Sequence, residues 1–180
     1  PRLALTATAV FSVTDARTAD RITKLVMALD GGPFRKVCDG CACVGGNALS
    51  FGRALAGAGG TVAAVELDAS RFAMLEHNVR VARLESTVTC FQGDLTALIA
   101  DGDGAARQAL READLLFLDP PWGGRAVDAM PRGRLVAAYS ADREKAAAFA
   151  GRYGGDGYDD MAAFLAADGC RRDLHVLMII

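Results

Sequence analysis

The chain has 180 residues, a hydrophobic fraction of 52% and a formal net charge of −2 at pH 7. This length fits one domain with a substantial core. The sequence has no run of roughly 18 apolar residues that would form a membrane-spanning helix. The acidic balance, with a pI near 5.7, is not that of a protein that grips long nucleic acid through its overall charge.

Five cysteines, an odd number, favour a reducing intracellular setting, nuclear or cytoplasmic. Cys38, Cys41 and Cys43 lie close together, but the sequence offers no fourth ligand near them. We therefore interpret these cysteines as small packing residues and expect no metal site.

Apolar residues recur with helical and strand periods along the chain. Ile22, Leu25, Val26 and Leu29, for example, have the spacing of an amphipathic helix. The expected elements in chain order are helix 16–29, strand 36–39, helix 48–56, strand 61–66, helix 70–84, strand 88–92, helix 105–112, strand 115–118, helices 142–150 and 158–167, and strand 174–180. Strands separated by helices predict a doubly wound α/β fold, with a mostly parallel sheet and helices on both faces.

The segment Asp119-Pro120-Pro121-Trp122-Gly123-Gly124 directly follows the apolar run 115–118. A buried strand that ends in such a turn predicts a rigid pocket at its carboxyl end. Proline removes backbone donors, so the local main chain offers mainly carbonyl acceptors to an amino group. Asp119 adds a carboxylate acceptor, and Trp122 offers a flat face on which a base would stack. The pattern favours methyl transfer to an amino group of a base, although a proline-rich structural turn is the alternative.

Acidic residues also stand at the ends of the three preceding strands. Asp39 ends the first strand, Glu66 the second, and Asp94 follows the third. The ligand of such a sheet lies beyond the carboxyl ends of its strands. The turn after the first strand carries Gly45 and Gly46 but lacks the dinucleotide-binding glycine pattern, because Cys43 stands at its first position. Acids without a phosphate-binding loop favour a ligand with adenosine but no pyrophosphate, namely S-adenosylmethionine.

Several segments together resemble the RNA cap guanine-N2 methyltransferase family, the trimethylguanosine synthases. The resemblance runs from Phe11 to Gly124 and rests on Phe11-Ser12-Val13-Thr14, Val37-Cys38-Asp39, Gly45-Gly46-Asn47, His77-Asn78, Gly93-Asp94 and Pro120-Pro121-Trp122-Gly123-Gly124. It implies a class I methyltransferase fold, S-adenosylmethionine as cofactor, and capped RNA or a cap nucleotide as substrate, with no membrane or metal partner.

The same resemblance implies roles for individual residues. Asp39, Gly45, Asn47, Glu66 and Asp94 are expected to bind the cofactor. The 7-methylguanine base is expected to stack on Trp122, while Asp119 and the Pro120 carbonyl receive its N2 amino protons. Thr14 and Asn78 fall on family positions near the substrate or cofactor and are expected to contact the substrate.

We expect a single methyltransferase domain 1–180, with a lead-in 1–14, a cofactor-binding core 15–124, a variable substrate-side helical region 125–173 and a last strand 174–180. The helical region contains a local excess of positive charge that is a candidate phosphate contact, with a solvated helical face as the alternative. Its cations are Arg125, Arg132, Arg134, Arg143, Lys145 and Arg152.

The sequence departs from the family at three places. Cys43 replaces a common glycine, Asp119 stands where many cellular members carry serine, and strand 174–180 would be only the fifth of the sheet. The second departure leans toward a divergent, viral-type branch, and the third predicts a sheet abbreviated at its C-terminal end.

Two other functions stay open. The first is amino methylation of another nucleic-acid base, either guanine N2 in ribosomal RNA or adenine N6, because those enzymes share the D-P-P-aromatic turn. The second is a non-catalytic subunit of the same fold, with the apolar strand 174–180 as an open edge that pairs with another chain.

Overall fold

A computed structural model describes residues 2–5, 13–28, 33–101 and 104–119, together with the backbone of three later strands. Pro120 and Trp122 lie outside the described residues, as do the six cations of 125–173 and the expected helix 142–150. The elements in chain order are α2 Ala16–Met27, β1 Lys36–Asp39, α3 Gly46–Ala56, β2 Thr61–Glu66, α4 Ala69–Ala82, β3 Val88–Gln92, α5 Leu95–Asp101, α6 Gly104–Arg111, β4 Leu115–Leu118, β5 Ala137–Tyr139, β6 Asp156–Tyr158 and β7 His175–Ile179.

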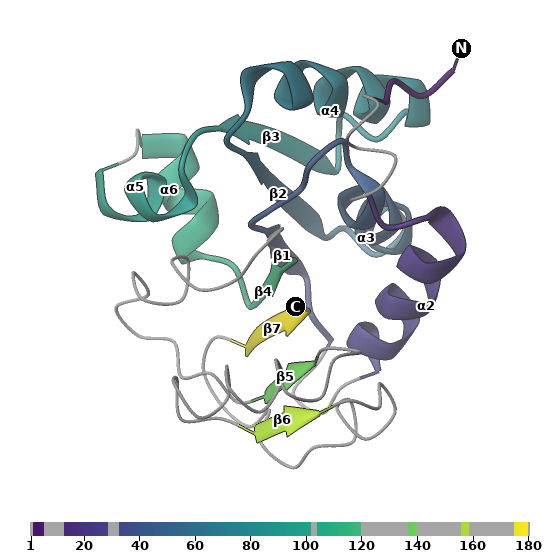
Figure 1. The fold of residues 1–180 in the computed structure, drawn as a ribbon, viewed down its shortest axis with the longest axis vertical. Coiled ribbons are helices and arrows are strands. Elements are labelled where there is room, and N and C mark those ends of the chain that lie inside the picture. The colour runs from purple at the N-terminus through teal and green to yellow at the C-terminus, as the bar shows by residue number, and fades with distance from the viewer. Residues whose placement is uncertain are drawn as a thin grey trace.

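The strands form one seven-stranded sheet in the order β3-β2-β1-β4-β7-β5-β6. Each strand pairing in this sheet is parallel, and Figure 1 shows the strands side by side with helices around them. β1 lies between β2 and β4, with Asp39 opposite Ala64 on one side and Phe117 on the other. The predicted doubly wound α/β fold is confirmed.

Two hydrophobic clusters cover the two faces of the sheet. The larger contains Val26 of α2, Phe51 of α3 and Leu75 of α4, packed on strand residues that include Val37. The smaller contains Leu95 of α5 and Leu110 of α6 and packs on the alternate strand residues, which include Cys38. This alternation follows from the two-residue period of a strand, which sends successive side chains to opposite faces. Helices α2, α3 and α4 therefore cover one face, and α5 and α6 cover the other.

Most predicted elements are confirmed, with small shifts at their ends. α3 begins at Gly46, two residues before the expected start, and α5 was not predicted. α5 spans seven residues, too short for its apolar positions to define a helical period over the expected window.

The C-terminal predictions need correction. Region 125–173 contains the strands β5 and β6, and Tyr158, the expected start of a helix, ends β6. The sheet therefore has seven strands and is not abbreviated to five. β7 pairs with β4 on one side and β5 on the other, so its backbone groups are already bonded and it is not the open edge that motivated the non-catalytic alternative.

Candidate functional site

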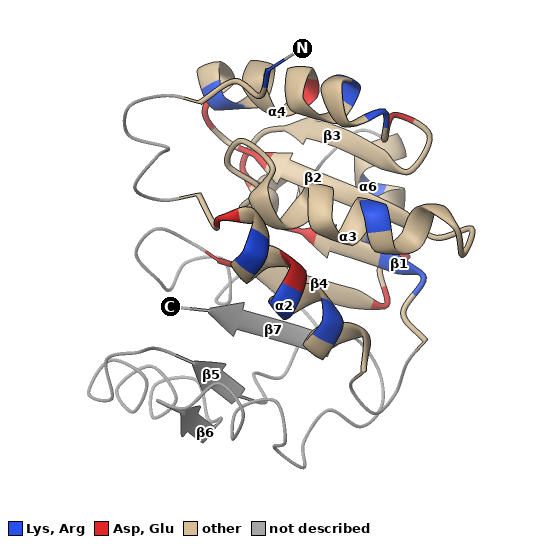
Figure 2. Ribbon diagram, turned by 90° about the vertical axis from the view of Figure 1, so that its right-hand side faces the viewer, with Lys and Arg blue, Asp and Glu red and all other residues tan. Residues whose placement is uncertain are grey.

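The carboxyl ends of β1, β2, β3 and β4 meet at one edge of the sheet because the strands are parallel. Asp39 and Glu66 are the last residues of β1 and β2, and Asp94 and Asp119 lie one or two residues beyond β3 and β4. Figure 2 shows the acidic segments at the arrowheads of these strands. The topology thus brings the four sequence-predicted carboxylates to the same edge.

Asp39 is the most deeply buried of the four carboxylates, with 1% of its surface exposed. Its Oδ1 accepts from the Cys41 backbone N–H at 3.4 Å, whereas its buried Oδ2 has no hydrogen-bond partner among the described residues. Burial, followed by the nearby charge of Asp119, raises the pKa of Asp39 to about 7. A buried carboxyl with an unused oxygen is costly unless a ligand supplies a donor or a positive charge.

Thr14 joins the lead-in segment to the strand ends through a short chain of hydrogen bonds. The Asn47 Nδ2 donates to Thr14 Oγ1 at 2.9 Å, and Thr14 Oγ1 donates to Asp119 Oδ2 at 3.2 Å. Burial raises the pKa of Asp119, and the hydrogen bonds from Thr14 and Asn47 oppose that effect. Asn47 Oδ1 is buried without a partner among the described residues. These two hydrogen bonds fix the position of one oxygen of Asp119.

The turn after β1 brings the main chain close to the lead-in. Gly45 adopts φ +103°, in the left-handed region that favours glycine. A Cβ added at Gly46 would lie 2.5 Å from the Thr14 carbonyl oxygen. The two glycines are therefore required by the turn and by the close contact with Thr14.

Cys43 also has a left-handed backbone, with φ +50°. This conformation explains why a glycine suits the position, because a side chain there crowds its own backbone. We expect Cys43→Gly to raise the free energy of unfolding by about 0.5–1 kcal/mol. Urea unfolding would measure the change. Cys41→Gly is the control, because Cys41 is not among the described residues with positive φ and its replacement should lower stability; a loss in both variants would contradict the strain at Cys43.

Glu66 is buried, and one of its oxygens is already occupied. Its Oε1 accepts from the Asp68 backbone N–H at 2.8 Å and from Arg71 Nε at 3.0 Å, and Arg71 Nη2 lies 2.9 Å away. If Glu66 binds the cofactor, as the resemblance implies, its Oε2 is the oxygen left for that contact. The sequence did not single out Arg71, although its place in the first turn of the helix after the acid would allow the pairing.

Asp94 forms the N-cap of α5. Its Oδ1 accepts from the backbone N–H groups of Thr96 at 2.8 Å and Ala97 at 3.2 Å, and from the Thr96 hydroxyl. The Thr96 hydroxyl, with the backbone bonds, lowers the pKa of Asp94. This cap holds the carboxylate in place at the edge of the site.

Asn78, a predicted substrate-side residue, is buried and hydrogen-bonded to the main chain. It is 1% exposed, and its Nδ2 donates to the carbonyls of Ala4 at 2.9 Å and Val44 at 2.8 Å, while its Oδ1 accepts from the Ala4 N–H at 2.6 Å. Because both ends of its amide bond backbone groups, Asn78 links segment 2–5 to the turn at Val44. It thereby supports the turn after β1 that carries Gly45 and Gly46.

The cysteines near β1 lie in an environment that disfavours thiolates. Burial raises the pKa of Cys41 to about 12 and that of Cys38 well above its usual range. Metal binding needs the thiolate. In the described part of the chain, no group of three or more His, Cys, Asp or Glu side chains is placed to hold a metal ion. Of the helices described, none combines the length and hydropathy that crossing a membrane requires.

Comparisons with known proteins place this geometry in context. The family profile described as RNA cap guanine-N2 methyltransferase matches residues 34–128, more than half of the chain. The trimethylguanosine synthase of Schizosaccharomyces pombe is 30% identical over 115 residues, which are 63% of this chain and 44% of that protein. An uncharacterized protein of Acanthamoeba polyphaga mimivirus is 32% identical over 81 residues, 45% of this chain and 27% of that protein. The chain thus spans less than half the length of these relatives.

Among solved structures, a methyltransferase from Geobacter sulfurreducens aligns with a TM-score of 0.47 and 20% identity, over 60% of this chain and 48% of that one.

Proposed function

This chain belongs to the RNA cap guanine-N2 methyltransferase family, and on that premise we propose that it transfers a methyl group from S-adenosylmethionine to the N2 amine of 7-methylguanosine in an RNA cap. The observation that carries the proposal is the group of partly or fully buried carboxylates at the ends of β1, β2 and β4, in which Asp39 Oδ2 has no hydrogen-bond partner among the described residues. Such a site favours cationic ligands, and both the cofactor and the 7-methylated base carry positive charge.

The residues at the edge fit the cofactor. S-adenosylmethionine would supply an activated methyl group on a sulfonium. Asp39 Oδ2 and Asn47 Oδ1, both buried and without partners among the described residues, are acceptors for its amino group. Glu66 Oε2 would take the ribose hydroxyls and the Asp94 carboxylate the adenine amine, while Gly45 lets the main chain come close.

The substrate half of the proposed site is centred on Asp119. Its carboxylate and the Pro120 carbonyl would accept the N2 protons and turn the nitrogen lone pair toward the methyl group. Positioning of this kind supplies most of the rate increase in a transfer of this type. When the new N–C bond has formed, N2 would release a proton, and the Asp119 carboxylate that holds the amine would accept it, since burial raises the pKa of Asp119 and so favours the protonated form.

A comparison of 7-methyl-GDP with GDP, each with S-adenosylmethionine, tests this function. We expect methylation of the first and little of the second. Equal turnover of 7-methyl-GDP and GDP would refute the cap as the substrate but would still support methyltransferase activity. Activity on ribosomal RNA or on adenine, without activity on cap nucleotides, would assign another base amine as substrate. A chain that does not bind S-adenosylhomocysteine in calorimetry would refute the enzyme altogether.

The proposed role of Trp122 gives a separate prediction. As a platform for the base, Trp122→Ala should remove most activity on 7-methylguanosine substrates, because stacking contributes about 1–3 kcal/mol and a cationic base adds up to about 2 kcal/mol. The melting temperature and the affinity for S-adenosylhomocysteine should stay nearly unchanged. Trp122→Phe should keep a fraction of the activity. Unfolding of Trp122→Ala, or full activity, would contradict this role.

A further inference from the structure

Helix α2 has one buried and one cationic face. Ala19, Ile22, Thr23 and Val26 are buried toward the core, and on the opposite side lie three exposed cations, Arg17, Arg21 and Lys24. Their i, i+4, i+7 spacing places them on one line along the helix, and Figure 2 shows these blue segments along α2. We call these three residues the α2 stripe.

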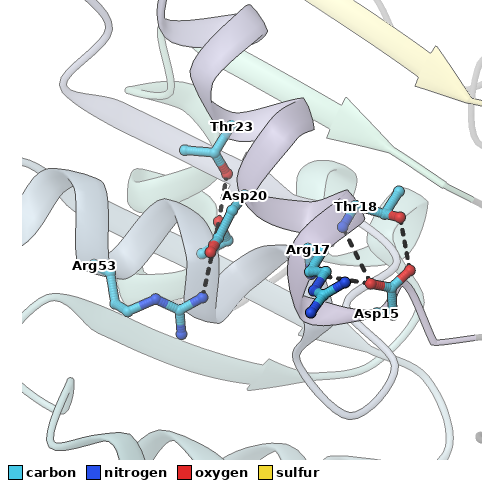
Figure 3. Close-up of polar contacts among 7 residues, drawn as sticks. Asp15, Arg17, Thr18, Asp20, Thr23 and Arg53 are labelled. Atoms are coloured by element: carbon cyan, nitrogen blue, oxygen red, sulfur yellow. Dashed lines mark hydrogen bonds and ion pairs between the residues drawn. The ribbon is translucent and has the colours of Figure 1, made fainter.

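The cations of the α2 stripe form no direct salt bridge with the acids described near them, although Arg17 and Lys24 lie close enough to Asp15 and Asp20 to help lower the pKa of those carboxyls. Among the residues that the structure describes, no ion pair involves Arg17, Arg21 or Lys24. Asp20, the only acid within α2, accepts from Arg53 Nη2 at 2.9 Å and from the Ser50 hydroxyl at 2.7 Å. Figure 3 shows Asp20 turned toward Arg53. Within the described part of the chain, the three cationic groups are therefore exposed and not held in a salt bridge, so they can bind an external anion.

The acid at the start of the helix is also engaged. Asp15 is the N-cap of α2 and accepts from the backbone N–H groups of Arg17 and Thr18 and from the Thr18 hydroxyl (Figure 3). These hydrogen bonds, that of the Thr18 hydroxyl first, lower the pKa of Asp15, so it is ionised at neutral pH. Among the described residues here, the three stripe cations and Arg53 of α3 exceed the carboxylates of Asp15 and Asp20 by two charges, whereas the whole chain has a net charge of −2.

The position of the stripe relates it to the site. α2 begins two residues after Thr14, whose hydroxyl donates to Asp119 at 3.2 Å. The stripe thus starts beside the carboxyl edge of the sheet and leads away from it, covering about 10 Å between Arg17 and Lys24 at roughly 1.5 Å per residue. The bonds Thr23 to Ser50, 2.8 Å, and Ser50 to Asp20 hold α2 on α3 and fix this direction.

We propose that the α2 stripe binds the phosphate backbone of the RNA that continues from the cap. This inference rests on the proposed function. If the cap binds at Asp119, the rest of the RNA must leave the site across the neighbouring surface, and α2 begins there. Arginine and lysine side chains in an exposed row match consecutive backbone phosphates. The α2 stripe starts beside the carboxyl edge of the sheet, where the cap is proposed to bind. This position favours the RNA that continues from the cap, and not an acidic protein, as the partner.

The test compares two substrates and two triple variants of the full chain. The first variant is Arg17→Gln, Arg21→Gln, Lys24→Gln. The control is Arg80→Gln, Arg83→Gln, Arg111→Gln, which removes the same charge from exposed residues at the ends of α4 and α6. The substrates are 7-methyl-GDP and a capped RNA of about twelve unstructured nucleotides, and KM is measured at several salt concentrations.

We expect the α2 variant to raise KM for the capped RNA about tenfold at low salt and to leave KM for 7-methyl-GDP unchanged. The slope of log KM against log salt should fall by about 2, since each phosphate contact on a single strand contributes roughly 0.7. The control variant should behave as the wild type. Equal losses in the two variants, or an equal loss on 7-methyl-GDP, would overturn the inference.

Binding of the uncapped, 5′-triphosphorylated RNA, followed by fluorescence anisotropy, separates this inference from the proposed function. If the protein methylates no cap nucleotide but binds this RNA through the α2 stripe, the proposed function is refuted and the RNA-binding surface is supported. Polyglutamate that displaces the RNA at equal charge concentration would instead identify an acidic protein as the partner and refute the RNA assignment.

Discussion

Asp119→Ala is expected to lower kcat/KM for 7-methylguanosine substrates by about 100-fold, because loss of an orienting group in a transfer reaction costs that much. The substitution should cost little stability. Burial already disfavours the charged carboxylate, as its raised pKa shows, and the hydrogen bond that is lost from Thr14 is long, at 3.2 Å. Steady-state kinetics and urea unfolding of the same preparations would measure both effects.

Asp119→Ser is the matched control. Serine is the residue that many relatives carry at this position by the resemblance, so the hydroxyl should retain much of the activity. Without the charge of Asp119, one of the causes that raise the pKa of Asp39 is lost. The profile of kcat/KM against pH should therefore shift toward lower pH. Full activity of Asp119→Ala, or its loss together with unfolding, would show that Asp119 does not orient the substrate.

Asp39→Asn is expected to abolish a large pH dependence of stability. The carboxyl has an ordinary pKa of 3.8 when unfolded and about 7 in the fold. Between these values the unfolded chain releases a proton that the folded chain retains, so a rise in pH from 4 to 7 destabilises the wild type and a further rise does not. The shift corresponds to on the order of 4 kcal/mol.

The variant should therefore equal the wild type near pH 4 and exceed its free energy of unfolding by a few kcal/mol at pH 8. Urea unfolding across this range, without cofactor, measures the difference. Asp94→Asn is the control, because Asp94 is exposed, its pKa is lowered and asparagine also caps helices well. Since this variant keeps Asp39, its stability should depend on pH between 5 and 8 in the same way as that of the wild type. A wild-type stability that rises in parallel with that of Asp39→Asn would contradict the raised pKa.

The same group predicts how cofactor binding depends on pH. If the amino group of S-adenosylmethionine pairs with Asp39, binding favours the carboxylate and releases its proton. Affinity should then rise with pH up to about 7 in the wild type and stay flat in Asp39→Asn. Calorimetry in buffers of different ionisation enthalpy would detect the released proton, and a pH-independent affinity in the wild type would place the ligand away from Asp39.

The sequence by itself determined the order of helices and strands up to β4, with the exception of α5, and the row of acids at the strand ends. Both depend on local patterns. The periods of 3.6 and 2 residues select helix and strand, and a parallel sheet then brings Asp39, Glu66 and Asp119 to one edge whatever the details of packing. The family segments added the proposed roles of these residues.

Only the tertiary structure decided which atoms of these residues are available. Residues distant in sequence contribute the bonds that occupy Asn78, the Thr14 hydroxyl that holds Asp119, and the burial that raises the pKa of Asp39. The place of β7 between β4 and β5 and the outward row of cations on α2 likewise depend on which faces are covered. The hydrophobic period of the sequence determines which face of a helix or strand is buried. It does not determine which residues pack against that face, because desolvation and hydrogen bonding depend on neighbours in space.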